Sequence, residues 1–288
     1  MRKVILGISI ILIGIFPFFQ GNASERPEIW GIAKMTFQVN NIELARDYYG
    51  GFLGFEEAFS YLSELGPITV FKINDHQFLE FTENRHATPE CTLLSVSFEC
   101  DDLPRLRSYL KMNGISVFQD IKPDRAGNEA LLILSTEFYN LEFISFKKDG
   151  LHRLSERRFL GKHRVADRLH HAGLYISDVE KANYLYRDIL GFREMWRYKK
   201  EDTSVPNFIY LQLPDCIENI EYVIVDDRNS SHPCFRVEDM QQTIYDLRFR
   251  KRDYPFAKPT IGNGNRWLLN LISNQGARIE FTESFTVR

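Results

Sequence analysis

The feature that most constrains this chain is an internal repeat, because four segments begin alike and end alike. Each begins with a short strand pattern that alternates apolar with other residues and closes on Asp or Asn, a good N-cap for the helix pattern that follows. Each ends with one Glu between two large apolar residues, and in a strand that Glu points to the opposite face from its neighbours. The opening strands are 34–41, 95–102, 171–178 and 232–239, and the closing residues are Glu80, Glu142, Glu221 and Glu280.

Each repeat has room for two more strands, so the predicted unit is a strand, a helix and three strands. The clearest helix patterns are 42–49 and 179–186, each followed by Leu-Gly-Phe, in which Gly ends the helix. Strand patterns at 68–73 and 130–134 fill the interior of two repeats. One unit cannot cover its own sheet, so units should pair. The sequence therefore predicts an α+β fold of four βαβββ modules in two domains, each a curled mixed sheet around a cleft. Whether modules pair in chain order stays open.

The repeat also sets the predicted domain boundaries. The first domain spans 30–147 and the second 169–284. Residues 148–168 between them are rich in Lys and Arg and poor in large apolar residues. Charge runs of this kind are usually solvated, so we expect a linker there rather than an anion-binding patch.

The N-terminus has the pattern of a secretory signal. Arg2 and Lys3 precede an apolar run, 4–19, and small polar residues follow it. This pattern predicts a signal peptide over 1–23, with cleavage after Ala23 or Ser24, and hence a secreted or periplasmic protein. The run is short for a membrane span, and no later stretch approaches that length, so no stable span is expected after cleavage. A retained anchor is the alternative.

Charge and cysteine content exclude some classes of partner and site. Lys and Arg total 36 against 39 Asp and Glu, so the formal charge is −3, whereas a dedicated nucleic-acid binder should be clearly basic. We expect a small-molecule partner and no nucleic acid. The four cysteines fit no zinc pattern, and a Cys91–Cys216 disulfide stays open. The oligomeric state is not predicted.

The chemistry is expected where the first residue of each repeat shares a face with the closing Glu. In the second pair of repeats these positions hold His171, Glu221, His232 and Glu280. Two imidazoles and two carboxylates in one cleft form a divalent-metal site, and Zn, Ni, Fe, Co and Mn all suit such ligands. Four protein ligands in an octahedral shell leave two places open, as a catalytic metal requires.

The first pair of repeats carries a different set at the same positions, namely Lys34, Glu80, Ser95 and Glu142. A protonated Lys is a poor ligand and Ser is a weak one, so we interpret this domain as metal-free, with a Lys–Glu ion pair in its cleft.

The remaining histidines do not share the register of the repeat. His170 is expected to face away from His171, and the others are expected on the surface: His76, His86, His152 and His163. Three aromatic residues are candidates for lining the second cleft, although their spacing also suits core or rim positions: Trp196, Tyr198 and Tyr210.

These motifs resemble the vicinal oxygen chelate superfamily, which includes glyoxalase I, epimerases, extradiol dioxygenases and bleomycin-binding proteins. The resemblance covers about 30–284. Glyoxalase I and the epimerases take one metal ligand from each opening and each closing strand, which fall here on His171, Glu221, His232 and Glu280. The resemblance then implies isomerase or lyase chemistry on a small substrate that chelates the metal through vicinal oxygens, with Glu221 or Glu280 as the catalytic base.

Two other functions within the superfamily remain as alternatives. Extradiol dioxygenases use two His and one Glu on Fe(II), which His171, His232 and Glu280 match. Their signature also has a His and a Tyr upstream of the final Glu, and 267–280 has neither. A metal-free binding protein of the bleomycin-resistance type is the third alternative, and the intact His and Glu registers argue against it for the second domain.

Overall fold

The computed structural model describes residues 25–286, except 89, 136, 138, 251–253 and 255–257 and the side chains at 285 and 286. The predicted signal peptide, 1–23, lies outside the described residues. Within the part of the chain that is described, no helix is both long and apolar enough to cross a membrane.

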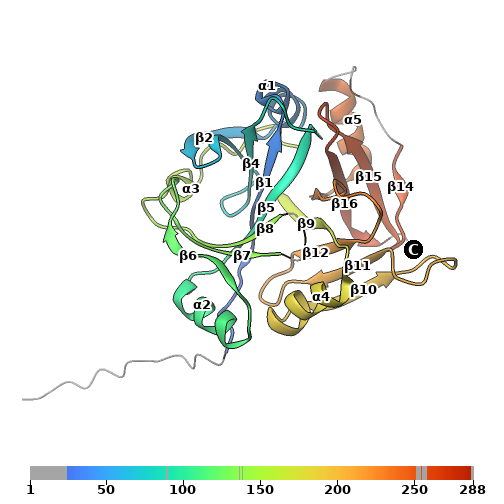
Figure 1. Cartoon of the computed structure of the whole chain (residues 1–288). Helices are drawn as coiled ribbons and strands as arrows, with labels where there is room; N and C mark the ends of the chain where they lie inside the picture. Colours follow the sequence, from blue (N-terminus) through green and yellow to red (C-terminus); the bar gives the residue numbers. More distant parts are fainter. Residues whose placement is uncertain are drawn as a thin grey trace, which may run out of the picture.

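The strands form two eight-stranded mixed sheets with the same topology (Figure 1). The first has the order β2-β3-β4-β1-β5-β8-β7-β6 and the second β10-β11-β12-β9-β13-β16-β15-β14. The strands of the first sheet are β1 (Gly31–Val39), β2 (Glu56–Ser63), β3 (Gly66–Lys72), β4 (Phe78–Glu83), β5 (Cys91–Glu99), β6 (Val117–Pro123), β7 (Glu129–Leu134) and β8 (Asn140–Ser145). Those of the second are β9 (Arg168–Tyr175), β10 (Arg193–Tyr198), β11 (Phe208–Gln212), β12 (Asn219–Val223), β13 (His232–Val237), β14 (Thr260–Ile261), β15 (Arg266–Ile272) and β16 (Arg278–Thr286).

This arrangement confirms the predicted α+β fold of βαβββ modules and shows how the modules pair. In every module the opening strand lies parallel to the closing strand, as β1 does to β4. The opening strands of consecutive modules then pair antiparallel, β1 with β5 and β9 with β13. The modules therefore pair in chain order, and all four chemistry-bearing strands of each domain lie side by side at the centre of one sheet.

Helices follow the opening strands, and each begins at the predicted Asp or Asn. Asn41 accepts from the backbone N–H of Glu43 and Leu44, and Asp102, Asp178 and Asp239 cap in the same way. The helices are α1 (Ile42–Ala45), continued by the π-helical η1 (Arg46–Phe52), α2 (Leu103–Met112), α4 (Val179–Ala182), continued by η2 (Asn183–Ile189), and α5 (Met240–Arg250).

One apolar core joins the two domains on the helix side of the sheets. The helix α5 contacts η1 of the first domain, and the Tyr109 hydroxyl of α2 donates to the carbonyl of Ile189 in η2. The Phe98 and Phe192 rings meet with centroids 5.5 Å apart across the same boundary. Met35 and Phe37 of β1 point into this core, whereas Lys34, which precedes Met35, points to the opposite, polar face.

Part of the predicted linker folds onto the first domain. A short helix, α3 (Leu151–Leu154), places His152 between the rings of Phe78 and Phe146, 4.7 and 4.8 Å away. The His152 side chain is buried, so its predicted surface position is wrong. The burial of His152 was not predicted because basic residues surround it in the sequence.

Candidate metal centre

The four predicted ligands meet in the second domain, although they lie up to 109 residues apart in the chain (171 to 280). His171 is on β9, Glu221 on β12, His232 on β13 and Glu280 on β16. All four side chains are buried, and one ligand atom from each lies within 4.8 Å of all the others. The Nε2 atom of His232 is 3.0 Å from Oε2 of Glu280 and 3.4 Å from Oε2 of Glu221. His171 Nε2 lies 3.5 Å from that Glu221 oxygen.

Local contacts orient His232 toward this centre. Its Nδ1 lies 2.8 Å from the carbonyl oxygen of Ser230 and donates a hydrogen bond to it, which leaves Nε2 as the nitrogen that faces the carboxylates. Backbone partners of this kind commonly fix the tautomer of a metal-binding histidine. The imidazole packs directly over Gly173, where a Cβ would overlap the ring. Glycine at 173 is therefore required for the position of His232.

The electrostatics of the centre favour a bound cation. Burial raises the pKa of Glu221, but the adjacent His171 and His232 outweigh it and hold that pKa well below its ordinary value. Burial and Arg278 lower the pKa of His232, yet its contacts with Glu221 and Glu280 win and raise it. The buried Oε2 of Glu221 has no hydrogen-bond partner among the described residues. A divalent ion would satisfy that oxygen and neutralise both carboxylates, so the residues present fit a metal.

His170 also enters the cleft, contrary to the prediction that it faces away. The pairing of β9 with β13 joins Cys234 to His171 and Phe235 to Leu169, so His170 is an extra residue in a β-bulge. The bulge breaks the alternation on which the prediction depended. The Nδ1 atoms of His170 and His171 lie 3.1 Å apart, and Arg266 donates to Nε2 of His170 across 3.0 Å.

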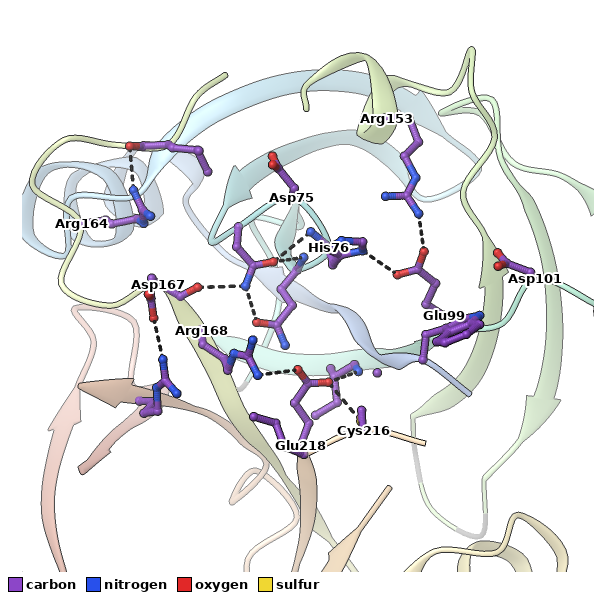
Figure 2. Close-up of a pocket in the computed structure, with 18 residues that line it drawn as sticks. Asp75, His76, Glu99, Asp101, Arg153, Arg164, Asp167, Arg168, Cys216 and Glu218 are labelled. Carbon is purple, nitrogen blue, oxygen red and sulfur yellow. Dashed lines mark hydrogen bonds and ion pairs between the residues drawn. The ribbon is translucent and has the colours of Figure 1, made fainter. Parts of the chain in front are cut away.

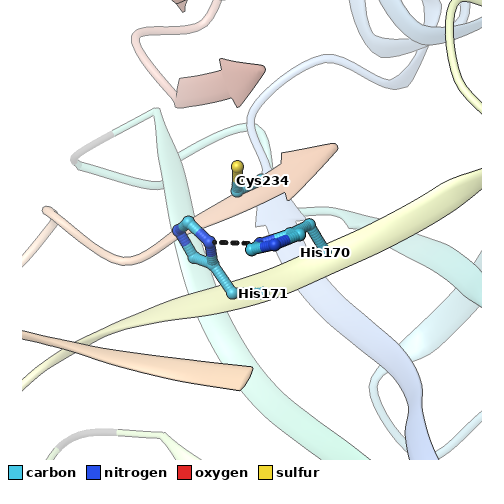
Figure 3. A group of neighbouring side chains, drawn as sticks. All are labelled: His170, His171 and Cys234. Atoms are coloured by element: carbon cyan, nitrogen blue, oxygen red, sulfur yellow. Dashed lines mark hydrogen bonds between the residues drawn. The ribbon is translucent and has the colours of Figure 1, made fainter. Parts of the chain in front are cut away.

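The same two histidines form a second group with Cys234 (Figure 3). Burial and the nearby Glu280 raise the pKa of the Cys234 thiol well above its ordinary value, and burial with His171 and Arg266 lowers the pKa of His170. A metal needs the thiolate, which this environment disfavours. The group of His171, Glu221, His232 and Glu280 is therefore the better metal site.

A cavity of about 390 Å³ opens onto the four ligands. Trp196 and Tyr210 line it, as predicted, whereas Tyr198 does not. The Tyr210 hydroxyl lies 3.4 Å from His171 Nε2. Two further residues, Arg266 and Arg278, line the cavity and were not predicted. Arg278 was open to prediction, because it lies two positions before Glu280 and so on the same face of the strand.

The first domain holds a different cluster at the equivalent positions. Lys34 Nζ lies 3.1 Å from Oε2 of Glu80 and 3.1 Å from Oε1 of Glu142, so the predicted Lys–Glu pair is present. His152 Nε2 is 3.4 Å from Oε1 of Glu80. Ser95 is absent from these contacts, and Ser97, two residues along β5, donates to Glu142 instead. The ammonium group of Lys34 thus lies between the two carboxylates of this cleft.

A larger cavity of about 820 Å³ lies between the domains, but it offers less chemistry (Figure 2). Its charged side chains are largely paired with one another: Glu99 binds both His76 and Arg153, and Arg236 pairs with Asp167. Burial raises the pKa of Glu218 there, and its Oε2 accepts from the backbone N–H of Ile32. No metal-ligand group of the described residues lies in this cavity.

The two sheets have the fold of the vicinal oxygen chelate superfamily, and the second domain holds four candidate metal ligands. The chain is similar in structure to the 2,3-dioxygenase LapB from Pseudomonas sp. KL28, with a TM-score of 0.69 and 16% identity over 92% of this chain and 96% of that one. A homoprotocatechuate 2,3-dioxygenase variant from Brevibacterium fuscum has a TM-score of 0.70 and 16% identity, over 91% of this chain and 74% of that one. An Mn(II)-bound glyoxalase from Novosphingobium aromaticivorans has a TM-score of 0.67 and 14% identity, over 89% of this chain and 82% of that one. No family model matches the sequence, and no curated protein matches it significantly.

Proposed function

We propose that this chain is an exported, divalent-metal-dependent enzyme of the glyoxalase or epimerase type, which acts as an isomerase or lyase on a small substrate with vicinal oxygens. The observation that carries the proposal is Glu221. Its carboxylate lies beside both histidines and completes a set of two His and two Glu, one from each central strand of the sheet. A site with only a facial triad of ligands has no role for this fourth carboxylate.

The side chains of the site have separate roles in such a reaction. When bound, a divalent metal would polarise a substrate carbonyl and make the neighbouring C–H more acidic. His171 and His232 would hold the ion, with Glu221 and Glu280 as the carboxylate ligands. Either carboxylate is in reach to accept the proton from the substrate, because both are buried beside the cavity. Arg278 donates to Oε2 of Glu280 at 3.0 Å, whereas Oε2 of Glu221 has no hydrogen-bond partner among the described residues, which favours Glu221 as the base.

Metal content tests the metal centre. The full chain is purified, and its metal is measured beside a His232→Ala variant and a His86→Ala control, which changes an exposed histidine outside the site. We expect about one divalent ion per chain in the wild type and the control and none in His232→Ala. An absence of metal from all three, after reconstitution with Mn²⁺, Ni²⁺, Zn²⁺ and Fe²⁺, would refute the proposal.

Proton transfer tests the reaction class. The metal-loaded protein is incubated in D₂O with α-hydroxy ketones and 2-oxo acid thioesters, and exchange at the carbon beside the carbonyl is followed by NMR. Exchange is expected for the wild type and lost in Glu221→Gln. Metal-loaded protein that catalyses no exchange on any member of the panel contradicts the isomerase or lyase function while leaving the metal site intact.

Ring cleavage by an extradiol dioxygenase is the second candidate, and the bulge at His170 favours it. The bulge brings the imidazole of His170 into the cavity that Tyr210 also lines, so an acid–base side chain is present that the strand alternation did not predict. His171, His232 and Glu280 would then be the Fe(II) ligands. Oxygen uptake by the Fe²⁺-loaded protein with catechol would promote this function over the first.

A further inference from the structure

The charge of the metal cavity is unbalanced once a cation is bound. Its described charged side chains are Glu221, Glu280, Arg266 and Arg278. Two carboxylates neutralise a divalent ion, and the two guanidinium groups then leave a net charge of +2. A cavity with this net positive charge favours a ligand of the opposite sign. The cavity is therefore suited to an anion.

The two arginines differ in how far their own neighbours satisfy them. Arg278 donates to Oδ1 of Asn270 at 2.8 Å and to Oε2 of Glu280 at 3.0 Å, so several of its donors are already used beside a metal ligand. Arg266 Nη1 lies 3.0 Å from Nε2 of His170, and Arg266 forms no ion pair with any carboxylate of the described residues. A planar guanidinium group offers five donors, so most of those of Arg266 are available to a ligand.

The position of Arg266 separates it from the metal ligands. Two imidazole rings, those of His170 and His171, lie between its guanidinium group and the nitrogen of His171 that faces the centre. An anion bound by Arg266 is therefore outside the coordination shell. A single ligand that reaches both places carries vicinal oxygens at one end and an anionic group at the other.

The walls of the cavity limit the size and shape of that ligand. Its volume of about 390 Å³ lies near the lower end of small-molecule sites. Trp196 on β10 meets the Tyr210 ring edge-on with centroids 5.3 Å apart, and both rings face the cavity with Phe208. The turn from Gly262 to Gly264 also lines it. Such walls suit a planar body of about one ring.

We propose that the substrate of this site is a small carboxylate, about one ring in size, whose vicinal oxygens bind the metal and whose carboxylate binds Arg266. This inference rests on the proposed metal function and narrows its substrate class. Arg266 is the residue that determines specificity for the anionic end. Its guanidinium group can donate two parallel hydrogen bonds to a carboxylate, in the fork geometry that such pairs favour.

Binding of chelating probes tests this role without any reaction. Benzohydroxamate offers two vicinal oxygens, and its 3-carboxy and 4-carboxy derivatives add the anionic group. Affinities are measured by calorimetry on the protein reconstituted with Mn²⁺. The wild type should bind the better carboxylated probe about tenfold to a hundredfold more tightly than benzohydroxamate, as a charge-assisted hydrogen-bond pair allows.

Matched variants separate Arg266 from the metal site. In Arg266→Gln the preference for the carboxylated probes should vanish, while the affinity for benzohydroxamate and the metal content stay as in the wild type. Arg266→Lys should keep part of the preference. Arg197→Gln, which changes an exposed arginine on β10 that pairs with Glu194, should change nothing.

The possible outcomes distinguish the two proposals. If the metal is bound and benzohydroxamate binds, but no preference exists in the wild type or the preference survives in Arg266→Gln, the role of Arg266 is wrong and the metal function stands. If no metal is bound, the proposed function fails, and the substrate class that rests on it fails with it.

Discussion

The ion pairs of Lys34 in the cleft of the first domain allow a prediction of how much its charge contributes to stability. This side chain is 4% exposed and lies between two carboxylates, those of Glu80, 1% exposed, and Glu142, 13% exposed. Burial opposes the charged form of Lys34, but Glu142 and Glu80 outweigh it and raise its pKa well above 10.5. Lys34→Met keeps the length of the side chain and removes its charge, so it isolates the ammonium group.

The size of the effect follows from the two contacts. Unit charges 3.1 Å apart attract by about 5 kcal/mol at an effective dielectric constant of about 20, and Lys34 has two such partners. Much of this attraction offsets the cost of burying the ions, and the loss of one partner of a buried pair typically costs about 3–5 kcal/mol. Lys34→Met should therefore lower the free energy of unfolding by about 3–5 kcal/mol, or the unfolding midpoint by roughly 10 °C.

Thermal and urea unfolding, followed by circular dichroism, measure this loss. The matched control is Lys147→Met, because Lys147 also pairs with a carboxylate, that of Glu129 at 2.7 Å, but both side chains are more than 40% exposed. An exposed pair contributes about 0–1 kcal/mol, so the control should unfold almost as the wild type does. If the Lys34 variant loses less than the control, burial does not decide the strength of the pair and the reasoning is refuted.

Three further predictions concern the metal centre and the Lys34 ion pairs. Gly173→Ala should push the His232 ring out of the centre and reduce metal content without a large loss of helix or sheet signal, which metal analysis and circular dichroism check together. His171→Lys should reproduce the Lys–Glu arrangement of the first domain, so the variant should fold, lack metal and show an unfolding midpoint unaffected by a chelator. Burial raises the pKa of Glu80, but Lys34 outweighs it and leaves that pKa below 4.5, so the contribution of Glu80 to stability is present above about pH 4.5 and lost as the pH falls. The stability difference between the wild type and Lys34→Met should accordingly shrink on acidification, and a constant difference between pH 4 and pH 8 contradicts it.

Much of the fold was open to prediction because the repeat tests each pattern four times. The alternation in 34–41, its closing Asn41 and the lone Glu80 each have counterparts in the other three modules, so a chance match in one is corrected by the rest. The face of each strand then follows from the period of two, and this placed the four candidate ligands together. The pairing of modules was not predictable, since it depends on long-range strand pairs, β1 with β5 and β9 with β13.

The errors have local causes that a period of two cannot show. His170 enters the cavity because one extra residue bulges from β9, and the pairing partner that reveals the bulge is 64 residues away, at Cys234 (170 to 234). His152 is buried because three rings and Asn128 surround it, although its neighbours in sequence are mostly polar or charged. Both histidines depend on tertiary contacts that override the local pattern.

The two domains solve the same electrostatic problem with different cations. Each places two Glu side chains from its closing strands into one cleft, where all but Glu142 are buried, and carboxylates removed from water need a positive charge beside them. In the first domain the cation is covalently part of the chain, as Lys34, and the ring of His152 fills the space beside it. In the second domain the imidazoles of His171 and His232 replace the ammonium group, and the proposed metal ion would supply the positive charge. The difference between Lys34 and His171 at one register is thus the difference between a cleft that stabilises the fold and one that is open to chemistry.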